Sequence, residues 1–185
     1  MIMKKHIISC IAFLLPAVSC QKIWEEDIRE RTIDSIRGYY EIQSGIWEGE
    51  EPIDIDGDGI ASFDYYDEWN RVFSGIGDHG AWMRPDGFIE IPYTFDGNAD
   101  WGGPVSLSRN VLRVGVKIDV IIEGEEGRLQ FRFPKDQDVV FEHTGYGEFT
   151  IRKEVTFTIQ KGERETDEIS GPVYFHFKRV SYFTE

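Results

Sequence analysis

The clearest chemical pattern in the sequence is an acidic, glycine-containing segment, DIDGDGI at residues 54–60. Three aspartates stand at alternate positions and Gly59 follows the third, as in the first half of a calcium-binding loop. Carboxylates at this spacing converge when the chain turns sharply at the glycine, and Ca²⁺ prefers about six to eight oxygen ligands. We therefore expect a structural calcium site whose ligands come from Asp54, Asp56, Asp58, Ile60 and Asp64.

An EF-hand loop has a bidentate glutamate at the position that Tyr65 occupies in this chain. The segment before the loop is also predicted to be a strand, so the motif does not belong to a pair of EF-hands. A tight Asp/Gly turn that binds no ion is the alternative. Because the aspartates repel one another, a cation outside the cell would stabilise the turn.

Aromatic residues are the second feature that bears on function. Trp82 and Trp101 lie in or beside segments rich in Gly, Asp and Asn, which we expect to be long loops. Aromatic loops over the mouth of a barrel could hold an apolar or sugar ligand. Alternatively, these side chains pack on the end of the barrel as lids.

No catalytic arrangement stands out in the sequence. The histidines after residue 20 are isolated from one another, and no G-x-S-x-G motif occurs. A glycosidase needs only two carboxylates, and a chain with 34 acidic residues contains such pairs by chance. We therefore do not predict an enzyme.

The N-terminal residues have the layout of a bacterial secretion signal. Two lysines precede an apolar run at residues 7–15, which is too short to span a membrane. The next segment, LPAVSC at residues 15–20, resembles a bacterial lipobox. We predict that residues 1–19 are a signal peptide and that Cys20 becomes the lipid-carrying first residue of the mature chain. An ordinary signal peptide without lipidation is the alternative.

Cleavage at this site would leave 166 residues, which suits a single domain with its own core. The 34 acidic residues would then face 18 basic ones, because two of the 20 Lys and Arg residues belong to the signal peptide. A strongly acidic surface repels phosphate groups, which argues against nucleic-acid binding. Attachment to a membrane would have to come from the lipid.

Apolar periodicity predicts the secondary structure. Residues 20–37 are expected to form a polar, lipid-attached tether or short helix, with apolar contacts at a spacing of four. From residue 38 onward apolar and polar residues mostly alternate, which predicts an antiparallel sheet with one buried face. The expected strands are residues 39–47, 89–95, 112–122, 129–133, 149–159 and 173–183.

Three segments carry expectations about individual side chains. The first strand is expected to place Tyr40, Ile42, Ser44 and Ile46 on one face and Tyr39, Glu41, Gln43 and Trp47 on the other. The strand at 112–122 has Leu112, Val114, Val116, Ile118, Val120 and Ile122 on one side, and a turn at 124–127 then begins a hairpin. A helix capped by Ser62 is expected to align Phe63, Tyr66, Trp69 and Phe73.

Strand edges promote aggregation, and closing a sheet into a barrel removes them. We therefore expect a mainly β chain with a single antiparallel β-barrel over residues 38–185. A two-sheet β-sandwich is the alternative.

The order of these features resembles the lipocalin-like lipoproteins of Gram-negative anaerobic bacteria. The resemblance is carried by AVSC at residues 17–20, GYYEI at 38–42, the Asp-rich turn and FDYY at 63–66, and Gly45-x-Trp47 approximates the glycine–aromatic signature of lipocalins. It implies a lipocalin-like barrel with one short helix after the first strand. It also implies a lipid-anchored location at the outer membrane, on the periplasmic face or the cell surface.

Two functions are compatible with these expectations. The first is a cell-envelope lipoprotein whose barrel binds a small apolar or amphipathic ligand, or a partner through its loops. The second is a non-enzymatic structural or interaction subunit of a surface assembly, and a hydrolase ranks third. The first two differ in whether Phe131, Phe133, Phe157 and Phe175 fill the interior.

Overall fold

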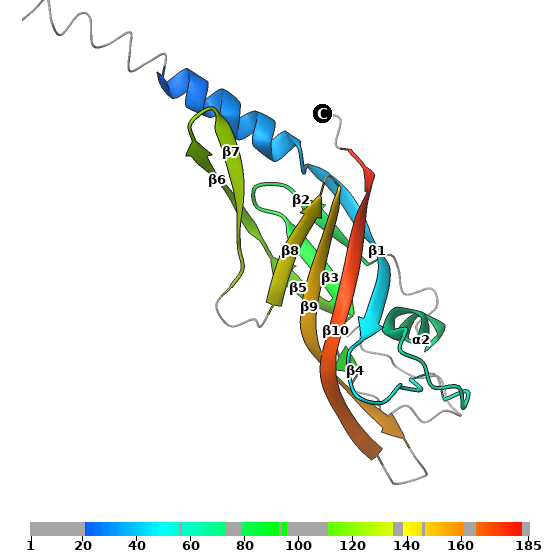
Figure 1. The fold of residues 1–185 in the computed structure, drawn as a ribbon. Coiled ribbons are helices and arrows are strands. Elements are labelled where there is room, and N and C mark those ends of the chain that lie inside the picture. Colours follow the sequence, from blue (N-terminus) through cyan, green and yellow to red (C-terminus); the bar gives the residue numbers. More distant parts are fainter. Residues whose placement is uncertain are drawn as a thin grey trace, which may run out of the picture.

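The computed structural model of the chain describes residues 21–55, 57–72, 79–92, 94–95, 111–134, 139–145, 147–160 and 166–182. Strands make up 59% of it, and they form an antiparallel half-barrel (Figure 1), so the mainly β antiparallel fold is confirmed. Within these residues no helix is both long and apolar enough to span a membrane.

In the part of the chain that the structure describes, the secondary structure consists of an N-terminal helix, a second short helix and ten strands. Residues 21–34 are helical, and α2 covers Tyr65–Val72. The strands are β1 Gly38–Trp47, β2 Gly80–Met83, β3 Phe88–Pro92, β4 Thr94–Phe95, β5 Val111–Gly115, β6 Lys117–Glu123, β7 Glu126–Arg132, β8 Val139–Gly145, β9 Glu148–Gln160 and β10 Thr166–Ser181. The predicted short helix after the first strand is therefore present.

The main sheet has the order β4-β9-β10-β1-β2-β3-β5, and β8 pairs with the same strand β9 as β4. The β4–β9 pair is parallel, and the other pairs are antiparallel. After β5 the chain passes through Val116 into the β6–β7 hairpin. The main sheet and this separate two-stranded hairpin meet at a seam between β8 and β7, where the ring centroids of Phe141 and Phe131 lie 4.3 Å apart.

The concave face of the sheet forms the core. In the longest strands, β9 and β10, every second side chain is buried from Ile151 to Phe157 and from Gly171 to Phe177, and Thr150 is buried as well. The apolar side chains that they bury are Phe149, Ile151, Val155, Phe157, Val173, Phe175 and Phe177. Lys153 on β9 shares this face and is only 9% exposed, which the apolar pattern did not predict.

Strand β1 departs from the predicted alternation. Its register against β10 shifts between Ile42 and Ser44, so one extra residue stands on the β1 side. Such a bulge moves all later side chains to the opposite face. Ile46 is therefore 42% exposed and Trp47 is buried, and the prediction that Ile46 shares a face with Tyr40 is wrong.

The segment from β5 to β7 follows the predicted burial pattern, but the single strand expected at 112–122 is divided at Val116 into β5 and β6, which belong to different sheets. Val114, Val116, Ile118 and Val120 are buried on one side, as expected. Glu123 pairs with Glu126, which leaves a two-residue turn between β6 and β7. Gly124 opens that turn with a φ of 66°, in the left-handed region that favours glycine.

Helix α2 begins later than predicted and buries a different face. Asp64, and not Ser62, is its N-cap, because the Asp64 Oδ1 accepts a hydrogen bond from the Asp67 amide at 2.9 Å. Tyr65 and Trp69 point into the core, whereas Phe63 precedes the helix and is 46% exposed. The predicted stripe that starts at Phe63 is therefore wrong, and its last member, Phe73, lies outside the described residues.

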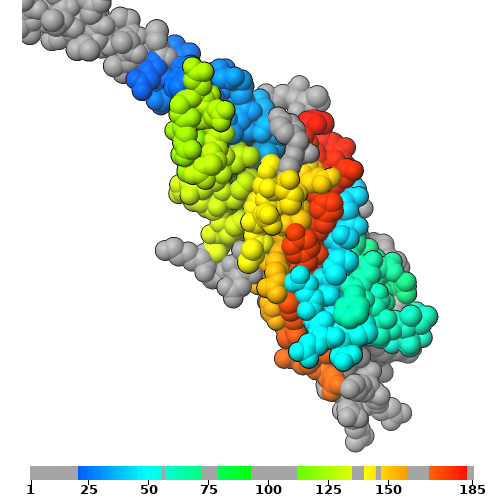
Figure 2. Space-filling model, in the orientation of Figure 1, coloured from blue at the N-terminus to red at the C-terminus, as the bar shows by residue number. Residues whose placement is uncertain are grey.

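The N-terminal helix lies on the outside of the β6–β7 hairpin, and Figure 2 shows the two segments in contact at one end of the molecule. Ile28 is 2% exposed, and Arg29 Nη1 donates a hydrogen bond to the Val120 carbonyl oxygen at 2.9 Å. Thr32 lies so close to Gly127 that a methyl group on this glycine would collide with its hydroxyl. Residues 21–34 are therefore a docked helix.

Candidate functional site

The Asp/Gly loop projects from the core between β1 and α2. Its base is closed by Ile53 and Ser62, which exchange backbone hydrogen bonds of 2.9 and 2.7 Å. Between them, both carboxylate oxygens of Asp54 accept backbone hydrogen bonds, from Gly57 at 2.8 Å and from Gly59 at 2.9 Å. Both glycines have a positive φ, of 74° and 86°. The Asp54 side chain thus holds the loop in a tight turn.

The other predicted ligands have partners of their own. The Asp58 Oδ1 accepts a hydrogen bond from the Ile60 amide at 2.7 Å, and its Oδ2 lies 3.4 Å from Arg71 Nη1. Asp64 caps α2 through its Oδ1. Asp56 lies outside the described residues, and among the described ones no three His, Cys, Asp or Glu side chains are grouped as a metal site.

Sequence reasoning missed Glu68, which connects α2 to this loop. The side chain is 1% exposed, and its Oε2 accepts a hydrogen bond from the Ile55 amide at 3.1 Å. Because the bond satisfies a buried backbone donor next to Asp54, it fixes the loop against the helix. The available signal was helical spacing, since Glu68 lies three residues after Tyr65 and one before Trp69 on the buried face.

Aromatic rings occupy the interior of the half-barrel. Near the seam, Phe149 stacks on Phe177 at 4.6 Å and on Phe141 at 5.1 Å, and Phe141 in turn contacts Phe131 and Phe133. Phe157 and Phe175 are 1% and 0% exposed, whereas Phe131 and Phe133 are partly buried against the core. All four phenylalanines that the sequence singled out therefore belong to the packed interior or its border.

The α2 end of the interior is also filled by aromatic rings. Tyr65 makes an edge contact with Phe175 at 5.9 Å, and Trp47 makes one with Phe157 at 5.8 Å. Burial raises the pKa of the Tyr65 hydroxyl, so this group stays neutral. Trp47 Nε1 donates a hydrogen bond to the Glu51 carbonyl oxygen at 2.9 Å, which leaves the indole fixed between strand β1 and its following turn.

Of the two tryptophans proposed for ligand contact, only Trp82 lies among the described residues, and it does not line this interior. Trp82 lies in β2, between the buried residues Ala81 and Met83, so its side chain points to the outer face of the sheet. There its ring contacts Tyr39 at 4.9 Å. Trp101 lies outside the described residues.

An open groove lies at the border of the half-barrel, between the β2–β3 turn and the end of β7. Its volume is about 330 Å³, and its lining includes Val116 and Phe133, with Asp86, Lys117 and Arg132 among the charged residues. The groove is partly open to solvent, unlike the enclosed pockets that bury most of a small ligand's surface.

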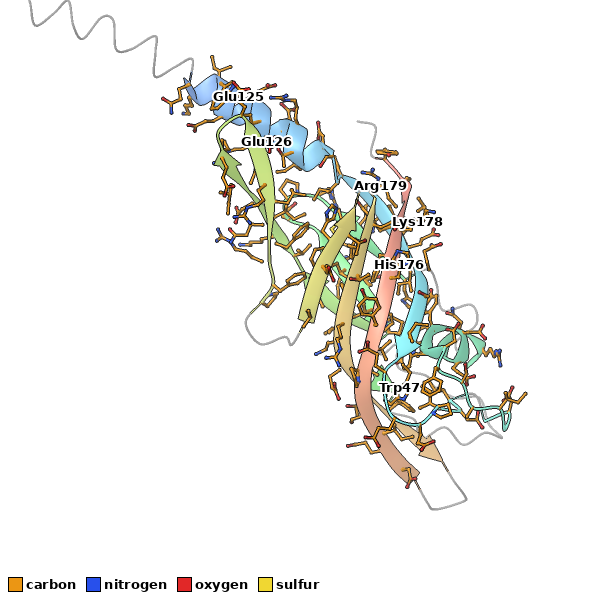
Figure 3. The ribbon with its side chains drawn as sticks, viewed as in Figure 1. Trp47, Glu125, Glu126, His176, Lys178 and Arg179 are labelled. Carbon is orange, nitrogen blue, oxygen red and sulfur yellow. The ribbon has the colours of Figure 1, made fainter. Side chains whose placement is uncertain are left out.

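The junction of the N-terminal helix with the sheet forms a second polar cluster. Tyr40 donates a hydrogen bond from its hydroxyl to the Ile36 carbonyl oxygen at 2.8 Å. Arg179 donates from Nη1 to the Ser35 carbonyl oxygen at 2.8 Å. Burial raises the pKa of Tyr40, and the charge of Arg179 opposes this effect. Figure 3 shows Arg179 on β10 beside the end of the helix.

The predicted site residues thus fall into separate places. The structure brings Asp54, Asp58 and Ile60 together in one loop and puts Asp64 at the start of α2, while Cys20 precedes the described residues. Comparisons with protein-family models, with curated proteins and with solved structures found no match.

Proposed function

We propose that this chain is a lipid-anchored protein of the bacterial outer membrane that binds a protein partner through its surface. The lipobox-like segment ending at Cys20 supports the anchor, and the lipocalin-like order of elements agrees with an exported domain. Partner binding is preferred over an internal small ligand because the interior of the half-barrel is occupied by its own aromatic side chains.

That packing is the observation that carries the proposal. Ring centroids near the seam are 4.3 to 5.5 Å apart, which is the ordinary separation of aromatic pairs in contact. Protein interiors packed in this way leave few voids larger than a water molecule. A ligand of ordinary size would have to displace these rings, and the partly open groove beside Phe133, at about 330 Å³, lies at the lower end of the volumes of ligand pockets.

The choice between partner and small ligand can be tested with an apolar fluorescent probe and native mass spectrometry. The purified wild-type chain is expected to bind no probe stoichiometrically. Phe141→Ala removes the ring that contacts Phe131, Phe133 and Phe149, so it should open a cavity and create probe binding. Val140→Ala is the matched control, because this neighbouring side chain is 63% exposed. Tight binding by the wild-type chain would contradict the proposal.

The anchor is tested separately by expressing the whole precursor in a bacterium with an outer membrane. Intact-mass measurement should show a chain that begins at Cys20 and carries acyl groups, and the protein should fractionate with the membrane. Cys20→Ser should yield an unacylated chain that is released from it. A wild-type chain without acyl mass would remove the proposed anchor.

A structural calcium ion in the Asp/Gly loop is a second proposal. It is supported by the alternating aspartates and by the Asp54 carboxylate, which already draws the two glycine amides around itself. Asp54, Asp56 and Asp58 would hold the ion together with the Ile60 carbonyl oxygen and Asp64. The ion would offset the mutual repulsion of these acids and stiffen the β1–α2 connection.

A further inference from the structure

Two large apolar side chains are exposed at the beginning of the described helix. Ile23 is 67% exposed and Trp24 is 41% exposed, although the helix buries Ile28 one turn later. Isolated exposed apolar residues are common on protein surfaces. This pair is distinctive because it lies within four residues of Cys20, the proposed site of lipid attachment.

Chain length restricts where this pair can lie. Four residues of fully extended chain span at most about 14 Å, so Trp24 stays close to a lipid carried by Cys20. The headgroup region of a bilayer leaflet is about 5–8 Å thick, and tryptophan is enriched in this layer. Both side chains are therefore within reach of the bilayer surface whenever the anchor is inserted.

The helix that carries the pair is joined firmly to the domain. Ile28 is buried, Arg29 is hydrogen-bonded to Val120, and Thr32 packs against Gly127. Just after the helix, Arg179 binds the Ser35 carbonyl oxygen. A helix held from Ile28 to Ser35 transmits its own orientation to the domain, whereas a flexible tether would not.

We propose that Ile23 and Trp24 insert into the interfacial layer of the bilayer beside acylated Cys20 and that the docked helix thereby sets how the domain stands on the membrane. The β6–β7 hairpin then faces the membrane, and α2 with the Asp/Gly loop faces away from it. Figure 3 shows Glu125 and Glu126 beside the helix at one end of the molecule and Trp47 at the α2 end. The inference rests on the proposed lipid anchor.

Charge around the pair identifies the kind of lipid surface it fits. Acidic side chains dominate the helix start and the hairpin turn, at Glu25, Glu26, Asp27, Glu123, Glu125 and Glu126. These carboxylates repel anionic headgroups, so the contact depends on apolar insertion. We expect it to be strongest on neutral bilayers, and on anionic bilayers added salt should strengthen it by screening the repulsion.

The contact is tested with the acylated mature chain bound to phosphatidylcholine vesicles whose acyl chains carry bromine, which quenches nearby tryptophan fluorescence. The wild-type chain should be quenched, and Trp24→Phe should lose that quenching. Trp82→Phe is the matched control and should retain it, because Trp82 belongs to β2. Equal quenching of the wild type and Trp24→Phe, or no quenching of either, would overturn the proposed contact.

The orientation is tested in the same vesicles with acceptor lipids. Since the acylated Cys20 is the only cysteine after residue 19, a cysteine introduced at Glu125 or Glu50 is a unique labelling site. Energy transfer should be stronger from position 125 than from position 50. Gly127→Ala, which disturbs helix docking, should reduce this difference. Equal transfer from both positions in the wild-type background would overturn the fixed orientation.

Failure of the anchor and failure of this inference have different signatures. Intact mass and vesicle flotation are measured first on the same preparation. A chain without acyl groups that does not float would remove both the anchor and the orientation that depends on it. A chain that is acylated and floats, but shows no Trp24-dependent quenching or equal transfer, would leave the anchor in place and reject the inference alone.

Discussion

Arg179 in β10 donates a hydrogen bond to the carbonyl oxygen of Ser35, which lies just after the N-terminal helix and 144 residues earlier in the chain. The last carbonyl groups of a helix lack intrahelical partners and carry the negative end of its dipole. A guanidinium group there satisfies an acceptor and the dipole together. The same side chain also binds Tyr182, so it connects the helix, the last strand and the C-terminal segment.

Arg179→Gln is therefore expected to destabilise the domain. Loss of charge-assisted hydrogen bonds should lower the free energy of unfolding by about 1.5–3 kcal/mol, measured by urea denaturation. Amide exchange should accelerate at residues 30–36, because the helix end loses its partner. Lys178→Gln is the control, since Lys178 is exposed on the same strand, and it should stay within about 0.5 kcal/mol of the wild type. Equal effects of the two variants would contradict this role.

Gly127→Ala tests whether the helix is packed tightly on the hairpin. A Cβ atom at this position would collide with the Thr32 hydroxyl and crowd Val120. Overpacking of this kind costs about 1–3 kcal/mol of stability. The matched control is Gly115→Ala in β5, where a Cβ atom meets no other atom within 4 Å. Urea denaturation of both variants should destabilise only the first, and a neutral Gly127→Ala would show that the helix is loosely attached.

Much of the sheet could be predicted because its strands obey a simple period. From Val114 to Val120 every second residue is buried, and the two-residue turn at Gly124 follows where the glycine predicts it. In these strands burial decides the conformation, so the apolar pattern contains the necessary information. The same reasoning located α2 to within a few residues.

The errors arise where a non-local interaction overrides the local pattern. The bulge after Ile42 depends on pairing with β10, which is more than a hundred residues away, and it exposes Ile46 against its pattern. The N-cap at Asp64 competes with Ser62, and both residues suit a cap in sequence. The partnership of Glu68 with the Ile55 amide requires the folded loop, so alternation alone could not identify it.

His143 gives the domain a predictable dependence on pH. Partial desolvation, and then the nearby positive charge of Arg179, lower the pKa of His143 below its usual value of 6.5. The unfolded chain therefore takes up this proton at a higher pH than the folded chain does, so the contribution of His143 to stability is lost as the pH falls through and below 6.5.

His143→Gln should remove this contribution. Urea midpoints are compared for the wild type and the variant between about pH 7.5 and 5, the range in which histidine titrates. The stability of the wild type should fall relative to that of the variant as the pH decreases. The difference between the two chains isolates His143 from the many carboxylates, which both share. Parallel profiles over this range would show that the proton is bound equally in the folded and unfolded states.

Calcium is expected to raise the melting temperature through the Asp/Gly loop. Extracellular calcium modules have dissociation constants up to about 1 mM, and at about 10 mM calcium such a site adds about 1.4 kcal/mol of stability. For a domain of this size the corresponding rise is about 3–6 °C. Asp56→Ala should abolish the rise. Glu126→Ala, which changes an exposed acid at the turn of the β6–β7 hairpin, should preserve it.

Because Asp54 also holds the loop through two backbone hydrogen bonds, Asp54→Ala should lower the melting temperature even without calcium. A wild-type chain that does not respond to millimolar calcium, or an Asp56→Ala variant that responds equally, would leave the loop as a turn held by hydrogen bonds alone.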